Sequence, residues 1–199
     1  MKRIGDIAVW EKVVPDELCD DLIDWFNDEW VMAKKRDESA VTDTYKFLYD
    51  QDLRKRFGPI LRDCGDEYFK FYGHQSWRKQ CEPVTMKVQR TAPGQKGYQG
   101  LHWEQGVGEL NAPRFAAWMA YLNTVPYSGG GRTIFPLQSR LGFRPEKGRM
   151  LIWPAAYTHP HHAYPEVTVD KYIITGWFTY KLAGSANDLA ETAKTSGED

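Results

Sequence analysis

The chain has 199 residues, which is long enough for one domain with a sizeable hydrophobic core. Its 26 basic and 27 acidic residues nearly cancel, so no excess positive charge indicates binding to nucleic acid or to an anionic membrane. The 8 Trp, 11 Tyr and 9 Phe residues are typical of a packed globular protein and exclude a disordered chain.

The cysteines and the start of the chain bear on the cellular setting. Cys19, Cys64 and Cys81 are odd in number and lack CxxC spacing, so the sequence indicates neither a disulfide framework nor a thiolate zinc site. The first six residues, MKRIGD, contain no apolar signal segment, and no apolar run is long enough to span a membrane. We therefore expect a cytoplasmic protein.

The first part of the chain, about residues 1–82, has the periodicity of helices. After Pro15, a residue that suits the first position of a helix, apolar residues recur at helical spacing, namely Leu18, Leu22, Ile23, Phe26 and Trp30. A second amphipathic stretch covers residues 53–69, and Gly58-Pro59 inside it predicts a kink or a restart. Residues 34–39 are polar and predict a loop. We expect the helices to pack on the outside of a sheet.

From about residue 83 the pattern changes to short strands separated by Gly and Pro. The expected strands cover residues 84–90, 115–122, 133–136, 150–153 and 172–180. Several short strands with regular turn signals favour an all-β barrel or sandwich core. We expect a single domain over residues 1–183, with its β core at about 83–183, followed by a small, polar and flexible tail at residues 184–199.

The motif His102-Trp103-Glu104 is the main chemical signal. Side chains alternate between the two faces of a strand, so His102 and Glu104 would point to one side and Trp103 to the other. One imidazole from the sequence THPHH at residues 158–162 would complete two histidines and a carboxylate around a metal. That set leaves positions open on the metal and is typical of non-haem Fe(II) oxygenases. The HxE motif alone is short, and hydrogen-bonded histidines without a metal are its alternative reading.

The motifs occur in a specific order along the chain. HxE is followed by YLN at 121–123, a Gly-rich turn leading to TxF at 133–135, GxxxxWPA at 148–155, THPH at 158–161 and DKYIITGW at 170–177. This order resembles the 2-oxoglutarate- and Fe(II)-dependent dioxygenases, specifically the prolyl-4-hydroxylase-like branch with its bacterial and phage relatives. The resemblance runs from about residue 84 to 180. It implies a mainly β fold with flanking N-terminal helices, the double-stranded β-helix (jelly roll, cupin-like).

The resemblance also implies the metal ligands. His102 and Glu104 match the first pair of ligands, although the family more often has Asp where this chain has Glu104. The distal histidine of relatives often precedes a basic residue by about ten positions, and His161 precedes Lys171 by ten. His161 is therefore the expected third ligand. His159 is the runner-up, and His162 is a more distant alternative.

The expected cosubstrate contacts follow from the same resemblance. Lys171 matches the basic residue that pairs with the distal carboxylate of 2-oxoglutarate, and a buried dicarboxylate needs such a cation. The alternative for Lys171 is a solvated residue at the start of a strand. Tyr121 matches a tyrosine that bonds the same carboxylate, or else it is a core aromatic with a satisfied hydroxyl. Thr175 lies four residues after Lys171, on the same strand face, and Gln89 is a further candidate.

The implied activity is that of an enzyme that uses Fe(II), 2-oxoglutarate and O2. Such an enzyme hydroxylates a C–H bond and releases succinate and CO2. The expected substrate is a peptide or protein, with a prolyl residue as one candidate, or a small molecule. Two alternatives are a cupin-like barrel with Zn or Mn and hydrolase or isomerase chemistry, and a non-catalytic barrel that serves as a binding module. A hydrolase or isomerase would not need Lys171 or Tyr121. The Glu at position 104, in place of the more common Asp, favours the non-catalytic barrel.

Overall fold

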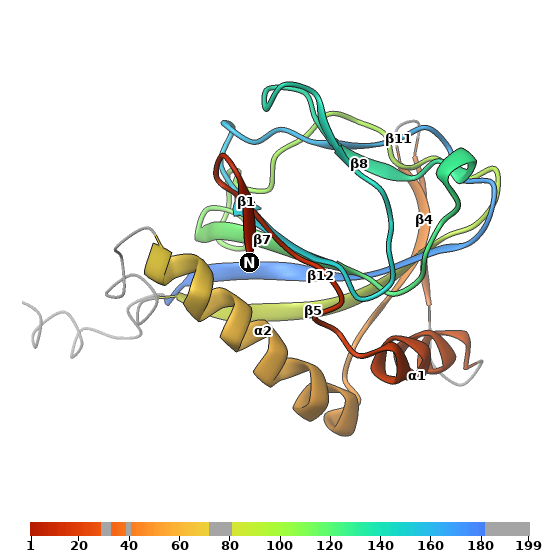
Figure 1. Cartoon of the computed structure of the whole chain (residues 1–199), viewed down its shortest axis with the longest axis horizontal. Helices are drawn as coiled ribbons and strands as arrows, with labels where there is room; N and C mark the ends of the chain where they lie inside the picture. Colours follow the sequence, from red (N-terminus) through yellow and green to blue (C-terminus); the bar gives the residue numbers. More distant parts are fainter. Residues whose placement is uncertain (29–32, 39–40, 72–80, 182–199) are drawn as a thin grey trace, which may run out of the picture.

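The computed structural model describes residues 1–28, 33–38, 41–71 and 81–181. Two β-sheets lie opposite each other, and two helices cover the outer face of the larger sheet (Figure 1). The described strands pair in antiparallel fashion within each sheet. This is the double-stranded β-helix with flanking helices that the sequence predicts. The predicted flexible tail, residues 184–199, lies outside the described residues.

The larger sheet has nine strands in the order β1-β2-β10-β7-β12-β5-β4-β3, with β6 paired to β4. They are β1 (Lys2–Ile4), β2 (Ile7–Trp10), β3 (Lys34–Glu38), β4 (Val41–Phe47), β5 (Cys81–Thr91), β6 (Gly97–Tyr98), β7 (Arg114–Tyr121), β10 (Met150–Pro154) and β12 (Lys171–Tyr180). The smaller sheet has the order β11-β8-β9 and comprises β8 (Arg132–Phe135), β9 (Leu141–Phe143) and β11 (His162–Tyr164). All five predicted strands are present, as β5, β7, β8, β10 and β12.

The central strand β7 explains why the molecule has two cores. Ala116, Trp118 and Ala120 pack on one face of the sheet with the residues of the two helices. Met119 and Tyr121 pack on the other face, with apolar residues of the smaller sheet. A strand that is buried on both faces needs apolar residues at every position, so its sequence is a continuous apolar run without alternation. The run at 115–122 has this property.

The helices form where the apolar spacing places them. Helix α1 (Asp16–Asn27) begins directly after Pro15, with Asp16 and Glu17 in its first turn, where negative charge favours a helix. Helix α2 (Gln51–Phe71) runs through Gly58-Pro59 without the restart that the sequence suggests. Pro59 is exposed, so its ring does not disturb the buried face of α2. Neither of these described helices is both long and apolar enough to cross a membrane.

The prediction of a helical part at about residues 1–82 is incomplete, because β1, β2, β3 and β4 lie there together with the two helices. The loop predicted at residues 34–39 is wrong for residues 34–38, which form β3 at one edge of the larger sheet. Charged residues are common on edge strands because they discourage pairing with another chain. Strand β2 is four apolar residues long, and a run of that length does not distinguish a strand from a helix.

Gly176 in β12 provides a test of this packing. A Cβ there would collide with the carbonyl oxygen of Thr85 and would lie 2.6 Å from Cζ2 of the buried Trp118. We expect Gly176→Ala to destabilise the protein by at least about 1–3 kcal/mol, as overpacking of a core does. The measurement is the free energy of unfolding in urea.

The matched control is Gly58→Ala in α2, where the nearest group is the flexible guanidinium of Arg62 at 3.3 Å. Alanine favours a helix over glycine by about 1 kcal/mol, whereas a Cβ directly before Pro59 disfavours the helical backbone. The two effects oppose each other, so we expect the free energy of unfolding of this variant to stay within about 1 kcal/mol of that of the natural chain. Equal stabilities for the two variants would contradict the packing described for β12.

Candidate active site

The two histidines of the site are held together by their backbones. His102 follows β6, His161 precedes β11, and each donates its amide to the carbonyl oxygen of the other, at 3.1 and 2.8 Å. Residues that exchange both hydrogen bonds are direct cross-strand neighbours, so their side chains lie side by side. Glu104 does not continue a regular strand. Its amide instead bonds the carbonyl of Ala155 at 3.0 Å, which returns the side chain towards the histidines.

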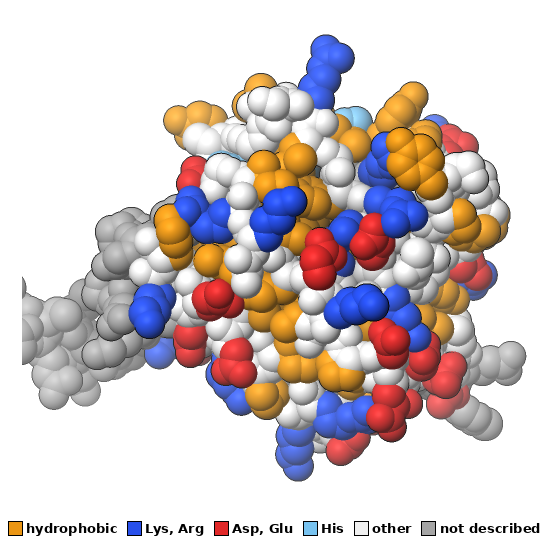
Figure 2. Space-filling model, in the orientation of Figure 1, with side chains coloured by type: hydrophobic (Ala, Val, Ile, Leu, Met, Phe, Trp, Pro, Cys, Tyr) orange, Lys and Arg blue, Asp and Glu red, His pale blue; other side chains and the backbone are white. Residues whose placement is uncertain are grey.

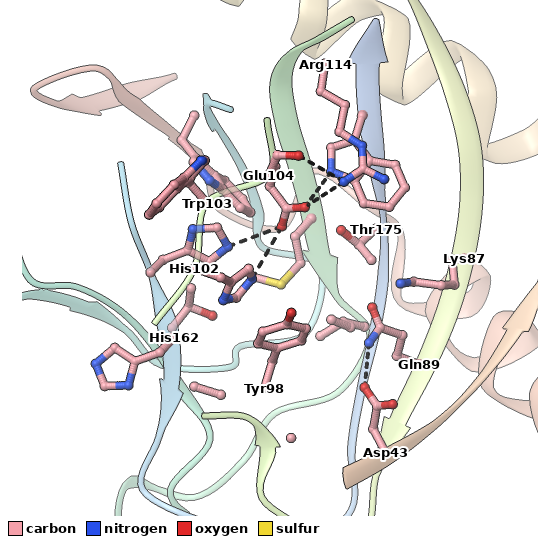
Figure 3. Close-up of a pocket in the computed structure, with 18 of the residues that line it drawn as sticks. Asp43, Lys87, Gln89, Tyr98, His102, Trp103, Glu104, Arg114, His162 and Thr175 are labelled. Carbon is pink, nitrogen blue, oxygen red and sulfur yellow. Dashed lines mark hydrogen bonds and ion pairs between the residues drawn. The ribbon is translucent and has the colours of Figure 1, made fainter. Parts of the chain in front are cut away.

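The three side chains converge at one point, as Figure 3 shows for Glu104 and His102. Glu104 Oε1 lies 3.6 Å from His102 Nε2 and 3.4 Å from His161 Nε2. One ligand atom from each residue lies within 4.8 Å of the others. Burial by itself would raise the pKa of the Glu104 carboxyl, but its contacts with His102 and His161 hold that pKa well below its usual value. The carboxylate is therefore ionised, as a metal ligand must be.

The Nδ1 atoms of His102 and His161, which point away from Glu104, lie next to backbone carbonyl oxygens. His102 Nδ1 lies 2.8 Å from the carbonyl oxygen of Gly100, and His161 Nδ1 lies 3.1 Å from that of His159. A carbonyl oxygen can only accept a hydrogen bond, so each Nδ1 carries the proton and each Nε2 is free to bind a metal. Two imidazoles and one carboxylate on one side of the metal fit Fe(II) and leave positions open for other ligands.

Of the three histidines considered for the distal ligand, the structure brings His161 to the site. His159 is buried with its Nδ1 2.9 Å from the hydroxyl of Thr158, and it does not belong to the group. Its carbonyl oxygen instead orients His161. His162 lines the adjoining cavity from β11 but is not one of the three converging residues.

A cavity of about 420 Å³ adjoins the three residues, and a volume of this order is typical of small-molecule sites. Lys171, Thr175 and Gln89 all line it. Their alignment follows from the register of β12 and β5, in which Lys171 pairs with Thr91, Ile173 with Gln89 and Thr175 with Lys87. Because side chains alternate along each strand, every second residue of both strands faces the cavity.

Lys171 is buried and is therefore not the solvated residue of the alternative interpretation. Its Nζ donates a hydrogen bond of 2.7 Å to the carbonyl of Gly131, in the Gly-rich turn. Burial lowers the pKa of the Lys171 ammonium to about 8, although the carboxylate of Asp43 acts in the opposite direction. Gln89 donates to Asp43 at 2.8 Å, and the Thr175 hydroxyl donates to the carbonyl of Trp118 at 2.7 Å.

Tyr121 does not line the cavity. Its hydroxyl is fully buried, 2.7 Å from the hydroxyl of Thr133 and 3.1 Å from the carbonyl oxygen of Phe143. It therefore has the satisfied hydroxyl of a core aromatic, while Thr133 faces the cavity. Two residues of β7 line the cavity, Arg114 at its start and Met119, two positions before Tyr121.

Sequence reasoning missed several residues of the cavity wall, among them Asp43, Lys87, Arg114, Thr133 and Trp177. Trp177 could have been found, because it follows Lys171 and Thr175 at two-residue spacing on β12. Asp43 could not, because its strand β4 lies in the part of the chain read as helical. Tyr98 also lines the cavity, and its ring lies tilted against that of His102 with 3.7 Å between the ring centres.

Comparisons with known proteins agree with this geometry. Residues 86–179 match the family model of the 2OG-Fe(II) oxygenase superfamily. A search of curated protein sequences found no significant match.

Several solved structures share the fold. A viral collagen prolyl hydroxylase from Paramecium bursaria Chlorella virus 1, in complex with 2-oxoglutarate, has a TM-score of 0.68 at 19% identity, over 89% of this chain and 97% of its own. A prolyl-4-hydroxylase from Pseudomonas putida has a TM-score of 0.72 at 14% identity, over 89% and 94%. A prolyl hydroxylase from Trichoplax adhaerens, in complex with a hypoxia inducible factor peptide, has a TM-score of 0.70 at 13% identity, over 98% and 88%.

The family match and the fold indicate a non-haem iron oxygenase, and the described residues include a His-Glu-His group that could hold the metal. The matched segment contains His102, Glu104, His161 and Lys171. The protein is a 2-oxoglutarate- and Fe(II)-dependent dioxygenase: residues 86–179 match the 2OG-Fe(II) oxygenase superfamily, and the fold is that of the prolyl 4-hydroxylases. Its cofactor is Fe(II), and its cosubstrates are 2-oxoglutarate and O2. This identification replaces both alternatives, the cupin-like hydrolase or isomerase and the non-catalytic barrel.

If Lys171 binds the distal carboxylate of 2-oxoglutarate, binding depends on pH. The ammonium is mostly protonated at pH 7 and loses its charge as the pH rises through about 8. Because a neutral amine no longer attracts the carboxylate, we expect the Kd of 2-oxoglutarate to rise about tenfold per pH unit above that value. Isothermal titration calorimetry, with Mn(II) in place of iron, would measure the Kd of 2-oxoglutarate at each pH.

The control for this titration is Lys171→Arg, whose guanidinium stays charged over the whole range. Its Kd should be nearly independent of pH. A Kd of the natural protein that stays constant between about pH 7 and 9.5 would contradict the role of Lys171.

Proposed function

We propose that His102, Glu104 and His161 hold Fe(II) through two Nε2 atoms and Oε1. The observation that supports this proposal is the convergence of these atoms beside a cavity that also contains a buried lysine. Bound Fe(II) would supply the redox chemistry that couples the decarboxylation of 2-oxoglutarate, to succinate and CO2, with hydroxylation of a C–H bond by O2.

The residues of this chain prepare the site for that chemistry. Lys171 pairs with the distal carboxylate of 2-oxoglutarate, and its burial strengthens the ion pair because little water screens the two charges. Gln89 and Thr175 line the same wall and orient the cosubstrate between Lys171 and the metal. Trp153 and Phe135 are buried against the ring of His161, with ring centres 5.0 and 5.4 Å away, and they exclude water from that side.

We propose a peptide or protein as the substrate, with a prolyl residue as the first candidate. The segment 101–110, which contains the HxE motif, supports this, because Trp103, Gln105 and Gly106 line the cavity. The segment also carries four exposed apolar residues: Leu101, Trp103, Val107 and Leu110. Val107 and Leu110 are 94% and 84% exposed. Exposed apolar groups that are adjacent to a site are typical of binding surfaces. A solved relative binds a peptide, and all three relatives described above are prolyl hydroxylases.

The surface charge does not favour a nucleic-acid substrate. On the face shown in Figure 2, Lys and Arg side chains alternate with Asp and Glu, and no extended basic area is visible. A protein that binds nucleic acid through its phosphates needs such an area.

We further propose that residues 1–183 form one domain, since β1 and β2 pair into the same sheet as β12 near the other end of the described chain.

We place the protein in the cytoplasm. Cys19, Cys64 and Cys81 are buried and form no disulfide within the described residues, which suits a reducing compartment.

An anaerobic visible spectrum tests the site. Adding Fe(II) and then 2-oxoglutarate to the purified protein should produce the weak charge-transfer band that arises when the keto acid chelates the metal. We expect His161→Ala to abolish the band, because a metal ligand is lost, and His159→Ala to keep it. His159 is a matched control, since it is a buried imidazole two residues away whose carbonyl survives the substitution.

The opposite result, with the band lost only in His159→Ala, would make His159 the distal ligand. Absence of the band in the natural protein, with Fe(II) bound, would contradict the proposed chelation of 2-oxoglutarate.

The substrate proposal is tested with proline-containing peptides and matched peptides in which alanine replaces the proline. Mass spectrometry should detect the gain of one oxygen only in the first set. We expect Val107→Asp/Leu110→Asp to raise the KM of an accepted peptide at least about tenfold, because charges replace the apolar contact surface. Decarboxylation of 2-oxoglutarate without peptide should be unchanged. If the double substitution leaves the KM of the peptide unchanged, the peptide binds elsewhere.

A further inference from the structure

The second oxygen of Glu104 is held by two residues on the side away from the histidines. Trp177 Nε1 donates a hydrogen bond of 2.8 Å to Glu104 Oε2. Arg114 Nη1 lies 3.5 Å from the same oxygen and donates a hydrogen bond of 3.0 Å to the backbone carbonyl of Glu104. In Figure 3, Glu104 lies between His102 on one side and Arg114 on the other. The two carboxylate oxygens therefore have different surroundings.

Arg114 and Trp177 also hold each other. The guanidinium carbon of Arg114 lies 3.6 Å from the centre of a Trp177 ring, which is the geometry of a cation–π contact. Arg114 begins β7 and Trp177 lies in β12, and these two strands are hydrogen-bonded neighbours in the larger sheet. Because both residues extend from the same rigid sheet, they form a fixed support for Glu104.

We propose that Trp177 and Arg114 are positioning residues that make Glu104 a single-oxygen ligand. They retain Oε2, so that only Oε1 is presented to the metal between His102 and His161. This inference rests on the proposed metal site.

The length of the glutamate side chain explains why Glu104 needs support from Trp177 and Arg114. Glu104 is one methylene longer than the aspartate that this family more often has, so it has one more torsion to restrain, and restraining side-chain torsions costs conformational entropy. The bond from Trp177 and the contact with Arg114 restrain that torsion before the metal binds. Partners that orient a ligand in this way typically contribute about 10–100-fold to metal affinity.

Affinity for Mn(II) tests the inference, with the free ion counted by electron paramagnetic resonance of the full chain. Trp177→Phe keeps an aromatic ring under Arg114 and removes only the N–H donor. We expect it to weaken Mn(II) binding at least about tenfold. Arg114→Gln removes the cation and should weaken binding as well.

Trp10→Phe is the matched control. Trp10 is buried, and its Nε1 donates a hydrogen bond of 2.7 Å to Glu67 Oε2, so it repeats the Trp–Glu pair away from the metal site. This control should leave Mn(II) affinity within about twofold of the natural chain, even if it lowers the unfolding temperature. The comparison separates a metal-specific effect from general destabilisation.

A double-mutant cycle with Glu104→Asp tests the link to glutamate. The shorter side chain cannot reach both the metal and Trp177, so adding Trp177→Phe to the Glu104→Asp variant should change its affinity by less than about twofold. In the natural chain, the indole N–H signal of Trp177, assigned by its loss in Trp177→Phe, should shift in the NMR spectrum when Zn(II) is added.

The outcomes are distinguishable. If the natural chain binds no Mn(II), the proposed metal site is wrong. If it binds Mn(II) and Trp177→Phe binds it equally well, the metal site stands and the positioning role of Trp177 is overturned. If Trp177→Phe weakens Mn(II) binding and Arg114→Gln does not, Arg114 has no part in positioning Glu104. An equal effect of Trp177→Phe with glutamate and with aspartate as the ligand would overturn the dependence on glutamate.

Discussion

The mutual backbone hydrogen bonds of His102 and His161 are the interaction on which the site depends. They join the segment after β6 to the start of β11, two regions that are distant in the sequence. The pairing places both imidazoles on one face, and Glu104 reaches them because its own amide is bonded to Ala155. Without this bridge the candidate ligands would lie in two separate segments, with His102 and Glu104 in one and His161 in the other. The conformational entropy of those segments is lost when the sheets form, so metal binding does not have to order them.

The rest of the cavity follows from strand geometry. Lys171, Thr175 and Trp177 lie on one face of β12, and Gln89 lies on the neighbouring strand β5. On this face of β12, the buried cation Lys171 lies at one end, and Trp177, which bonds Glu104, lies towards the other. The opposite faces of the same strands pack against α1 and α2, where Phe178 is fully buried. A single alternating pattern therefore produces both the chemical wall and the structural core.

The two buried ions of this cavity, Glu104 and Lys171, differ in how fully their charges are compensated. Glu104 is balanced by Arg114 and the two histidines, and Lys171 bonds the carbonyl of Gly131 with Asp43 in its vicinity. A buried ammonium without a full counter-charge has a lowered pKa, which leaves it ready to gain a dicarboxylate ligand. The cavity is thus electrostatically incomplete at the lysine end and complete at the end of Glu104.

Local patterns in the chain were sufficient to predict the five core strands and both helices and to single out His102 and Glu104, whereas the choice of His161 and Lys171 came from the resemblance of the motif order to a known family. These features depend on periodicity and on short spacings, which a single sequence carries. Contacts between distant segments set the remainder. They place β1 to β4 in the larger sheet, Asp43 in the cavity, Tyr121 behind Thr133, and Trp177 with Arg114 behind Glu104. Strand order and register bring such residues together, and no local pattern records which strand will be the neighbour of another.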